Sequence, residues 1–316
     1  MEFNQVISQA QSLDYQVISP APRDIWRKIA QQDELSLVSQ SPEWVDCMRL
    51  GKHALDASRY YELEDGQQII LPMIRQKFLF GAATNAASFT DSWGMGGLIS
   101  SMPLRPKDIQ LVLRDLVNQP DLSVRIRPNP LQAKLWQEAT QIGLTAIPRL
   151  AHVLELEGGF DYLFQNKFRS TTRTAIRKAE KNGVVVECDT TGRLLPVFYQ
   201  LFDLSLDRWA QKQHEPPFLT KLRGHRRDPL RKFKIMSEQL GRAFQVWVAW
   251  VNGQPAASII VLQGKNASYT RGAMDIRIAG PVRANDLLHR LAIEDACEQG
   301  CRFYHMGESG ESSSLS

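Results

Sequence analysis

Residues 160–186 read FDYLFQNKFRSTTRTAIRKAEKNGVVV and decide how the rest of this 316-residue sequence is interpreted. Side chains of one stripe recur every four positions, as they do along one face of a helix. The stripe consists of Phe164, Phe168, Thr172 and Ile176. It predicts one long helix over Phe160–Asn182 with this face toward the core. Gly183 suits the residue after a helix, because glycine adopts a left-handed backbone without steric cost.

A second stripe on the same predicted helix is basic. Arg169, Arg173 and Arg177 stand at i, i+4 and i+8, and Lys178 follows directly. The planar guanidinium group makes two parallel charge-assisted hydrogen bonds to a phosphate, so the stripe has the chemistry of a phosphate-binding face. A solvated helix face with local salt bridges is the alternative interpretation.

Outward from this helix, the C-terminal half has the order of an α/β unit: strand, helices, three strands, helix, strand. The expected strands are His152–Leu156, Val184–Cys188, Phe244–Asn252, Gln254–Gln263, Asn266–Met274 and Arg302–Met306. The expected helices are Leu194–Lys212, Pro217–Leu240 and Val282–Gln299. The N-terminal half alternates short strands and helices in a similar order. We therefore expect two domains, over residues 1–150 and 151–316.

Composition excludes several classes of protein. A hydrophobic content of 43% and a charged content of 23% are those of a globular chain, and no apolar run is long enough for a membrane span. The four cysteines lack zinc or disulfide spacing and no histidine cluster is visible, so we expect reduced thiols, no metal and a cytoplasmic protein. The net charge is +4, yet residues 160–250 carry 17 basic and 9 acidic side chains, a local excess that suits a phosphate-bearing ligand.

These residues in this order resemble the FemAB-like branch of the GNAT acyltransferases, which includes the BioF2-like acetyltransferase domain. The most specific part runs from Arg169 to Val184 and has the form R-x-x-x-R-x-x-I-R-K-A-E-K-x-G-V. Four weaker stretches support it: QSPEWVDCM at 40–48, WGMGGLIS at 93–100, QPAASIIVLQG at 254–264 and DLLHRLAIEDACEQGCRFYHMGESG at 286–310.

The resemblance implies two tandem GNAT-like domains, each a mixed, mostly antiparallel sheet flanked by helices, with the N-terminal domain on the acceptor side. It implies an N-acyltransferase that moves an acyl group, with acetyl the expected one, from acyl-CoA to an amine by direct attack. The acceptor would be an amine-bearing small molecule or a cell-envelope precursor, and no cofactor would stay bound. An aminoacyl-tRNA-dependent Fem-type enzyme acting on a cell-wall precursor is the alternative, and a non-catalytic module that binds an anionic ligand is a second one.

The family resemblance also suggests where a CoA pyrophosphate would bind. GNAT enzymes hold it at a loop between a strand and a helix, and here that place is Arg277-Ile278-Ala279-Gly280-Pro281-Val282. Arg277 and Gly280 match the loop pattern, and Arg283 and Asn285 are further candidate donors to phosphate. Pro281 lacks an N–H and Val282 replaces a small residue, so an ordinary strand–helix turn remains the alternative.

The candidate catalytic residues lie around the last strand. Amine acylation needs a base for the ammonium proton and an acid for the leaving group. Glu308 or His305 is the expected base and Asp275 a further candidate, while Tyr269 on the neighbouring strand is the expected acid. The alternatives are an exposed loop carboxylate for Glu308 and a hydrogen-bonded strand histidine for His305.

Three further segments carry expectations. Trp93 and Gly96 belong to a predicted glycine-bearing strand, where missing side chains let a ligand or a second backbone approach. In this interpretation both residues line the acceptor cleft. A bulge in the strand is the alternative. The basic run over 221–234 fits phosphates or an exposed helix. Related chains continue past the segment at 306–310, so we expect this chain to lack a final strand, its last strand to end near Met306 and residues from Ser309 onward to be mobile.

Overall fold

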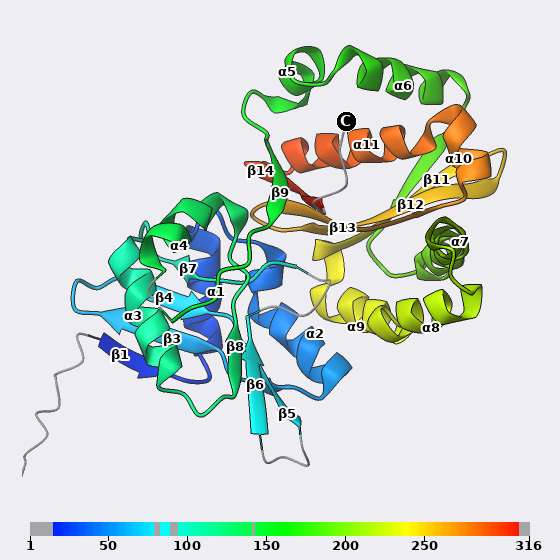
Figure 1. The fold of residues 1–316 in the computed structure, drawn as a ribbon. Coiled ribbons are helices and arrows are strands. Elements are labelled where there is room, and N and C mark those ends of the chain that lie inside the picture. The colour runs from blue at the N-terminus through cyan, green and yellow to red at the C-terminus, as the bar shows by residue number, and fades with distance from the viewer. Residues whose placement is uncertain (1–14, 79–82, 89–93, 141–142, 310–316) are drawn as a thin grey trace, which may run out of the picture.

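The computed structural model describes residues 15–78, 83–88, 94–140 and 143–309, which form helices packed on three β-sheets (Figure 1). The strands of the N-terminal part are β1 (Tyr15–Ile18), β2 (Leu55–Asp56), β3 (Arg59–Leu63), β4 (Gln68–Leu71), β5 (Ile74–Phe78), β6 (Ala83–Ala87), β7 (Ile99–Ser100) and β8 (Ser123–Arg125). Its α-helices are α1 (Arg23–Gln32), α2 (Pro42–Lys52), α3 (Pro106–Val117) and α4 (Ala133–Ala139).

The C-terminal part has longer elements. Its strands are β9 (Leu150–Glu155), β10 (Val185–Asp189), β11 (Phe244–Val251), β12 (Gln254–Gln263), β13 (Ala267–Met274) and β14 (Phe303–Ser309). Its α-helices are α5 (Gly159–Asn166), α6 (Ser170–Lys181), α7 (Leu195–Gln213), α8 (Pro217–Arg227), α9 (Leu230–Leu240), α10 (Ile276–Val282) and α11 (Ala284–Glu298). None of the helices formed by the described residues is long and apolar enough to cross a bilayer.

The predicted fold class is confirmed. The C-terminal strands form one six-stranded sheet in the order β10-β11-β12-β13-β14-β9, in which only β13 and β14 pair in parallel. The N-terminal strands form two four-stranded sheets, β1-β3-β4-β7 and β2-β5-β6-β8. Helices α5, α6 and α11 cover one face of the six-stranded sheet, and α7, α8 and α9 lie on its other side (Figure 1). The arrangement is that of two tandem, mixed and mostly antiparallel units.

Apolar burial holds the two parts together. One core cluster contains Trp26, Trp44 and Met48 of the N-terminal part together with Phe198 and Phe233 of the C-terminal part. Removal of these large side chains from water is the dominant favourable term in such packing. The strands nevertheless divide between residues 125 and 150, and the predicted boundary at residue 150 stays a prediction.

The long helix predicted over 160–182 is wrong in one respect, because two helices replace it. α5 ends at Asn166, Arg169 is extended (φ −60°, ψ 148°), and α6 begins at Ser170. Phe164 and Phe168 remain neighbours across the break, with ring centroids 5.7 Å apart. The four-residue spacing of apolar side chains therefore continues across the break, so this spacing alone does not reveal where one helix ends and the next begins.

The helix predicted over 217–240 is also divided, into α8 and α9. The break falls at Asp228-Pro229, where the ring of Pro229 disfavours a helical backbone at the preceding residue. Pro229 is visible in the sequence as a helix-breaking residue, but the prediction continued one helix through it.

Candidate active site

The two parallel strands of the six-stranded sheet separate along their length. β13 and β14 are paired only at Ala267–Tyr304 and Ser268–His305. Beyond these pairs β13 continues along β12 as far as Met274, and β14 continues along β9 as far as Ser309. Strand register shifts at Ile260/Val261 and His305/Gly307 accompany the separation. The opening leaves backbone polar groups of both strands unpaired with each other, as a ligand-binding edge requires.

Tyr269 lies at this opening. A β-carbon at Gly272 would stand 2.5 Å from the Tyr269 hydroxyl, and one at Gly307 would stand 4.0 Å from its ring. Gly272 therefore makes room for the tyrosine, and Gly307 of the other strand lies in contact distance of its ring. His289 of α11 packs its ring edge-to-face on Tyr269, with centroids 4.9 Å apart. Sequence reasoning named Tyr269 but missed His289, which lies beside the apolar face of α11.

Burial sets the protonation of this pair. Desolvation raises the pKa of Tyr269 and lowers the pKa of His289 to about 4, because the charged form of each is disfavoured away from water. At neutral pH Tyr269 is a phenol that donates a hydrogen bond, and His289 is a neutral imidazole. The Nδ1 atom of His289 is buried and has no hydrogen-bond partner among the described residues. The opening thus holds a proton donor beside a proton acceptor.

His305 lies on β14 in register with Ser268, at the closed end of the opening. Its side chain is fully buried, and neither ring nitrogen has a hydrogen-bond partner within the described part of the chain. Desolvation lowers its pKa to about 4, so the imidazole is neutral. The residue is a strand histidine, as the alternative interpretation had it, but without the expected hydrogen bond. A substrate would reach it only after the surrounding side chains move.

Glu308 lies on β14 rather than on an exposed loop, and its side chain is 17% exposed. Nε of Arg127, in the N-terminal part, donates to its Oε1 at 2.9 Å, and Nη2 of the same guanidinium forms an ion pair with that oxygen at 2.5 Å. Arg149 stands farther away, with Nη1 3.9 Å from Oε2. This carboxylate would have to leave its ion pair before taking a proton from an amine.

Asp275 and the candidate pyrophosphate segment form a self-contained unit. Asp275 caps α10: its carboxylate accepts from the backbone N–H and the guanidinium of Arg277, and its carbonyl accepts from Ile278 and Ala279. The hydrogen bond from Arg277 is the main cause that lowers the pKa of Asp275. The loop expected at 277–282 is therefore a short helix, a correction caused by this cap. Arg283 follows in a left-handed conformation (φ 61°), and Asn285 lies in the first turn of α11.

The basic residues of the predicted stripe differ in their surroundings: Arg173 makes hydrogen bonds to the backbone, and the others are exposed to solvent. Arg173 donates to three backbone carbonyls at the end of α5, those of Gln165 (2.9 Å), Phe168 (2.7 Å) and Phe164 (3.4 Å). These are carbonyls that a helix C-terminus leaves unpaired. Arg169, Arg177 and Lys178 are exposed. The structure does not bring Arg169, Arg173 and Arg177 onto one helical face, because Arg169 precedes α6.

The glycines at 94–97 serve close packing of backbone on backbone. A β-carbon at Gly96 would lie 1.9 Å from the carbonyl oxygen of Ser88, and the Gly96 N–H donates to the Arg127 carbonyl at 2.7 Å. Of the strand predicted over 93–100, only Ile99–Ser100 is formed within the described residues. Trp93 lies outside the described residues. A second backbone therefore approaches Gly96, and this is one of the two possibilities that the sequence predicted for the missing side chain.

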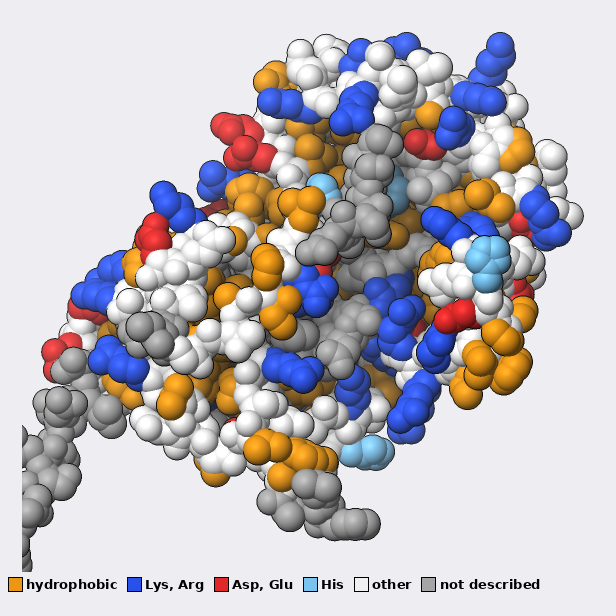
Figure 2. All heavy atoms as spheres, viewed as in Figure 1, with side chains coloured by type: hydrophobic (Ala, Val, Ile, Leu, Met, Phe, Trp, Pro, Cys, Tyr) orange, Lys and Arg blue, Asp and Glu red, His pale blue; other side chains and the backbone are white. Residues whose placement is uncertain are grey.

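The second basic run surrounds a buried carboxylate that sequence reasoning missed. Asp228 is fully buried between α8 and α9 and pairs with Arg227 (2.7 Å), Lys232 (3.3 Å) and Arg271 of β13 (3.2 Å). Burial lowers the pKa of Lys232 to about 7. The run is consequently only partly an exposed helix face. Figure 2 shows further Lys and Arg side chains on the surface around α8 and α9.

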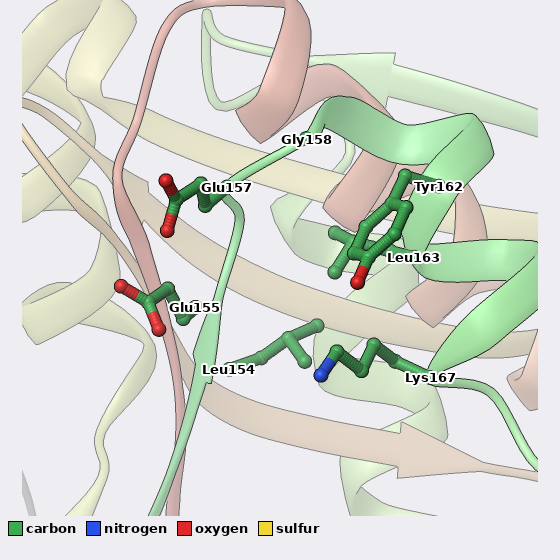
Figure 3. Close-up of a pocket in the computed structure, with 7 residues that line it drawn as sticks. All are labelled: Leu154, Glu155, Glu157, Gly158, Tyr162, Leu163 and Lys167. Atoms are coloured by element: carbon green, nitrogen blue, oxygen red, sulfur yellow. The ribbon is translucent and has the colours of Figure 1, made fainter.

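A separate hollow of about 510 Å³ lies between β9 and α5 (Figure 3). Its lining residues are Leu154, Glu155, Glu157, Gly158, Tyr162, Leu163 and Lys167. Figure 3 shows Tyr162, Leu163 and Lys167 of the helix side on one side of the strand segment, while the carboxylates of Glu155 and Glu157 are directed to its other side. The volume suits a small ligand. Leu154 pairs with Tyr304 of β14, which places the hollow one strand away from the opening.

Comparisons with known proteins agree with this geometry. Residues 166–312 match the family model of the acetyltransferase (GNAT) domain. A crystal structure of FemX superposes with a TM-score of 0.65 at 11% sequence identity, over 95% of this chain and 90% of that one. A conserved protein of unknown function from Bacteroides thetaiotaomicron superposes with a TM-score of 0.50 at 12% identity, over 94% of this chain and 90% of that one. No curated protein sequence matches.

The sheet with one parallel pair, its opening and the matched domain define a GNAT-superfamily acyltransferase fold. The fold is also the one seen in FemX, which agrees with the FemAB-like resemblance of the sequence.

Proposed function

We propose that this protein is an N-acyltransferase that acylates an amine at the opening between β13 and β14. In this reaction the amine nitrogen attacks the acyl carbon, a C–N bond forms and the bond from that carbon to the sulfur or oxygen of the donor breaks. One proton leaves the nitrogen and one proton is taken up by the leaving group. The pair of Tyr269 and His289 carries the proposal, because it sets a phenol and a neutral imidazole at the place where the strands part.

Tyr269 is assigned as the general acid. Its raised pKa keeps the proton on the phenol at neutral pH, and its hydroxyl is directed over Gly272 at the opening. His289 is assigned as the proton acceptor, because its ring contacts Tyr269 at the opening and its Nδ1 atom has no hydrogen-bond partner among the described residues. His305 and Glu308 are the alternative bases. They rank second because the His305 side chain is fully buried and the Glu308 carboxylate is paired with Arg127.

Acyl-CoA is the first donor that we propose, in line with the matched GNAT domain. Arg277, Gly280, Arg283 and Asn285 are the residues that would meet its diphosphate. The guanidinium of Arg277 is 79% exposed although it pairs with Asp275, so it can turn toward a bound anion. Space around Gly280 is open, with Ile276 the nearest group at 3.5 Å from an added β-carbon.

Aminoacyl-tRNA is the second donor that we propose, with a cell-envelope precursor as acceptor. The fold shared with FemX supports it. So does the capped helix α10, because its first N–H groups already bond to Asp275 and do not point to a diphosphate. The excess of basic side chains over residues 160–250 fits a large polyanion as well as a nucleotide.

One comparison separates the donors and the non-catalytic alternative. We would measure thermal shift and amide formation with acetyl-CoA, longer acyl-CoAs and a charged tRNA mixture, using wild type and Tyr269→Phe. Tyr162→Phe is the matched control, since Tyr162 is an exposed tyrosine of the neighbouring hollow. We expect turnover with one donor class, and a loss of about a hundredfold or more in kcat for Tyr269→Phe only. Binding without turnover for any donor would refute the proposed reaction.

A further inference from the structure

Helix α8 exposes a ridge of large apolar side chains. Phe218, Leu219 and Leu222 are 68%, 39% and 64% exposed. Leu222 is four positions after Phe218 and three after Leu219, so it neighbours both on one side of the helix. Gly224 lies on the opposite side, where a β-carbon would stand 2.6 Å from Leu206 of α7. The close packing at Gly224 fixes which side of α8 meets the protein, and the apolar ridge therefore points outward.

Basic side chains accompany this ridge. α8 contains Lys221, Arg223, Arg226 and Arg227 and has no Asp or Glu within Pro217–Arg227. Arg226 stands one turn beyond Leu222, on the same outward side. Residues 203–234 carry 9 basic and 4 acidic side chains, a net charge of 9 − 4 = +5 with neutral histidines.

The acidic side chains of this segment are already engaged. Asp203 pairs with His225, Asp207 with Lys221, Glu215 with Arg223, and Asp228 with the buried cations described above. Arg226, Arg231 and Lys234 form no ion pair with another residue of the described chain. Their charge is available to an outside partner. Figure 2 shows the matching surface, with hydrophobic side chains at the outer edge near α8 and Lys and Arg side chains beside them.

We propose that α8 docks this protein on the surface of an anionic phospholipid bilayer. An apolar ridge with arginines alongside is the pattern of a helix that lies in the membrane interface, where the apolar side chains enter the acyl boundary and the cations meet the headgroups. Phosphates of an RNA would pair with the arginines but would leave Phe218, Leu219 and Leu222 in water. The lipid surface is therefore the partner that accounts for both halves of the pattern.

The docking surface is separate from the proposed catalytic opening. α8 packs on α7, which belongs to the core cluster on one side of the sheet, whereas Tyr269 packs in the cluster on the side of α11. A bilayer against α8 does not require the opening to be covered. Vesicle binding and acyl transfer therefore test two independent statements.

The test is sedimentation of the full chain with vesicles of phosphatidylcholine alone and of phosphatidylcholine with about one third phosphatidylglycerol. We expect at least tenfold tighter binding to the anionic vesicles, weakened by salt. The double variant Phe218→Ser/Leu222→Ser should lose about tenfold of that affinity, and Arg226→Glu several-fold. Val117→Ser and Arg114→Glu on α3 are the matched controls at exposed positions, and they should bind like wild type.

Several outcomes would overturn the proposal. Equal binding to both kinds of vesicle, or unchanged binding of the double variant with its melting temperature preserved, would exclude the ridge as a lipid contact. Arg226-dependent binding of a tRNA mixture without vesicle binding would assign the face to RNA. A dimer on gel filtration that the double variant abolishes, without vesicle binding, would assign it to a second copy of the chain.

Discussion

Arg127 and Glu308 are 181 residues apart in the chain and form an ion pair that joins the N-terminal part to the last strand of the C-terminal sheet. Asn266 of the C-terminal part holds the same junction. It donates to the carbonyls of Glu34 and Ser36 in the N-terminal part. The junction places the segment after β8 beside the part of β14 that borders the opening. The two units are consequently fixed next to the proposed reaction site.

Removal of this ion pair should weaken the fold. Arg127 and Glu308 are 26% and 17% exposed, so Arg127→Ala leaves a largely desolvated carboxylate with only the distant Arg149. We expect a loss of about 1–3 kcal/mol in the free energy of unfolding, measured by urea denaturation. Arg149→Ala is the control, since Arg149 is 66% exposed, and it should change that free energy by less than about 0.5 kcal/mol. Equal effects of the two variants would contradict the assignment.

Arg173 should behave as a structural residue. Its guanidinium satisfies carbonyls at the end of α5, so Arg173→Ala is expected to lower the free energy of unfolding by about 1–3 kcal/mol. The neighbouring Arg177 is exposed, and Arg177→Ala should leave stability within about 0.5 kcal/mol of wild type. The measurement is chemical denaturation of both variants beside a donor titration. A stable Arg173→Ala with weakened donor binding would restore the phosphate-binding interpretation of the stripe.

The pH dependence of stability should report His305. Its pKa is about 4 in the folded chain and about 6.5 when unfolded, so between these values the unfolded chain binds more protons. Stability is therefore fully present above about pH 6.5 and is lost as the pH falls toward 4, by about 2–3 kcal/mol from this residue. His289 adds a loss of the same sign.

The check for His305 compares melting temperatures near neutral and acid pH. His305→Leu removes the buried imidazole and should reduce the fall in stability on acidification. His214→Asn is the control, because His214 is exposed and asparagine tolerates its left-handed backbone (φ 54°). An unchanged pH profile in His305→Leu would show that another group governs the acid transition.

Much of the fold was predictable, because it is encoded in local period and composition. The three strands of the meander β11–β13 and the amphipathic helix α11 follow from alternating and four-residue apolar patterns. The division between α5 and α6 did not follow, since Phe164 and Phe168 keep the same spacing and stay in contact across the break. At that break Arg173 turns back to the carbonyls of Gln165 and Phe168, a contact that the apolar spacing does not indicate.

The site was predictable in part for the same reason. Tyr269 was named because it precedes the end of a strand that borders the last strand, and the structure places it at the opening. His289 was missed because α11 and β13 are distant in the chain and only the packed sheet brings their rings together. The engagement of Glu308 by Arg127 was likewise invisible, since no local pattern links residues 181 apart.

Gly272 should be required for the position of Tyr269. An alanine there would bring its β-carbon to 2.5 Å from the tyrosine hydroxyl and 3.4 Å from the ring carbon that bears it, so the ring must swing away. Because the displaced group is the end of a side chain and not backbone, Gly272→Ala should fold with a stability cost below about 2 kcal/mol. Its kcat should nevertheless fall about as far as that of Tyr269→Phe, and the double variant Gly272→Ala/Tyr269→Phe should be no slower than either single one.

Gly51→Ala on α2 is the control, since nothing lies within 4 Å of its added β-carbon, and it should keep full activity. Additive losses in the double variant would mean that Gly272 acts independently of Tyr269, and the assignment of the tyrosine as the acid would lose this support.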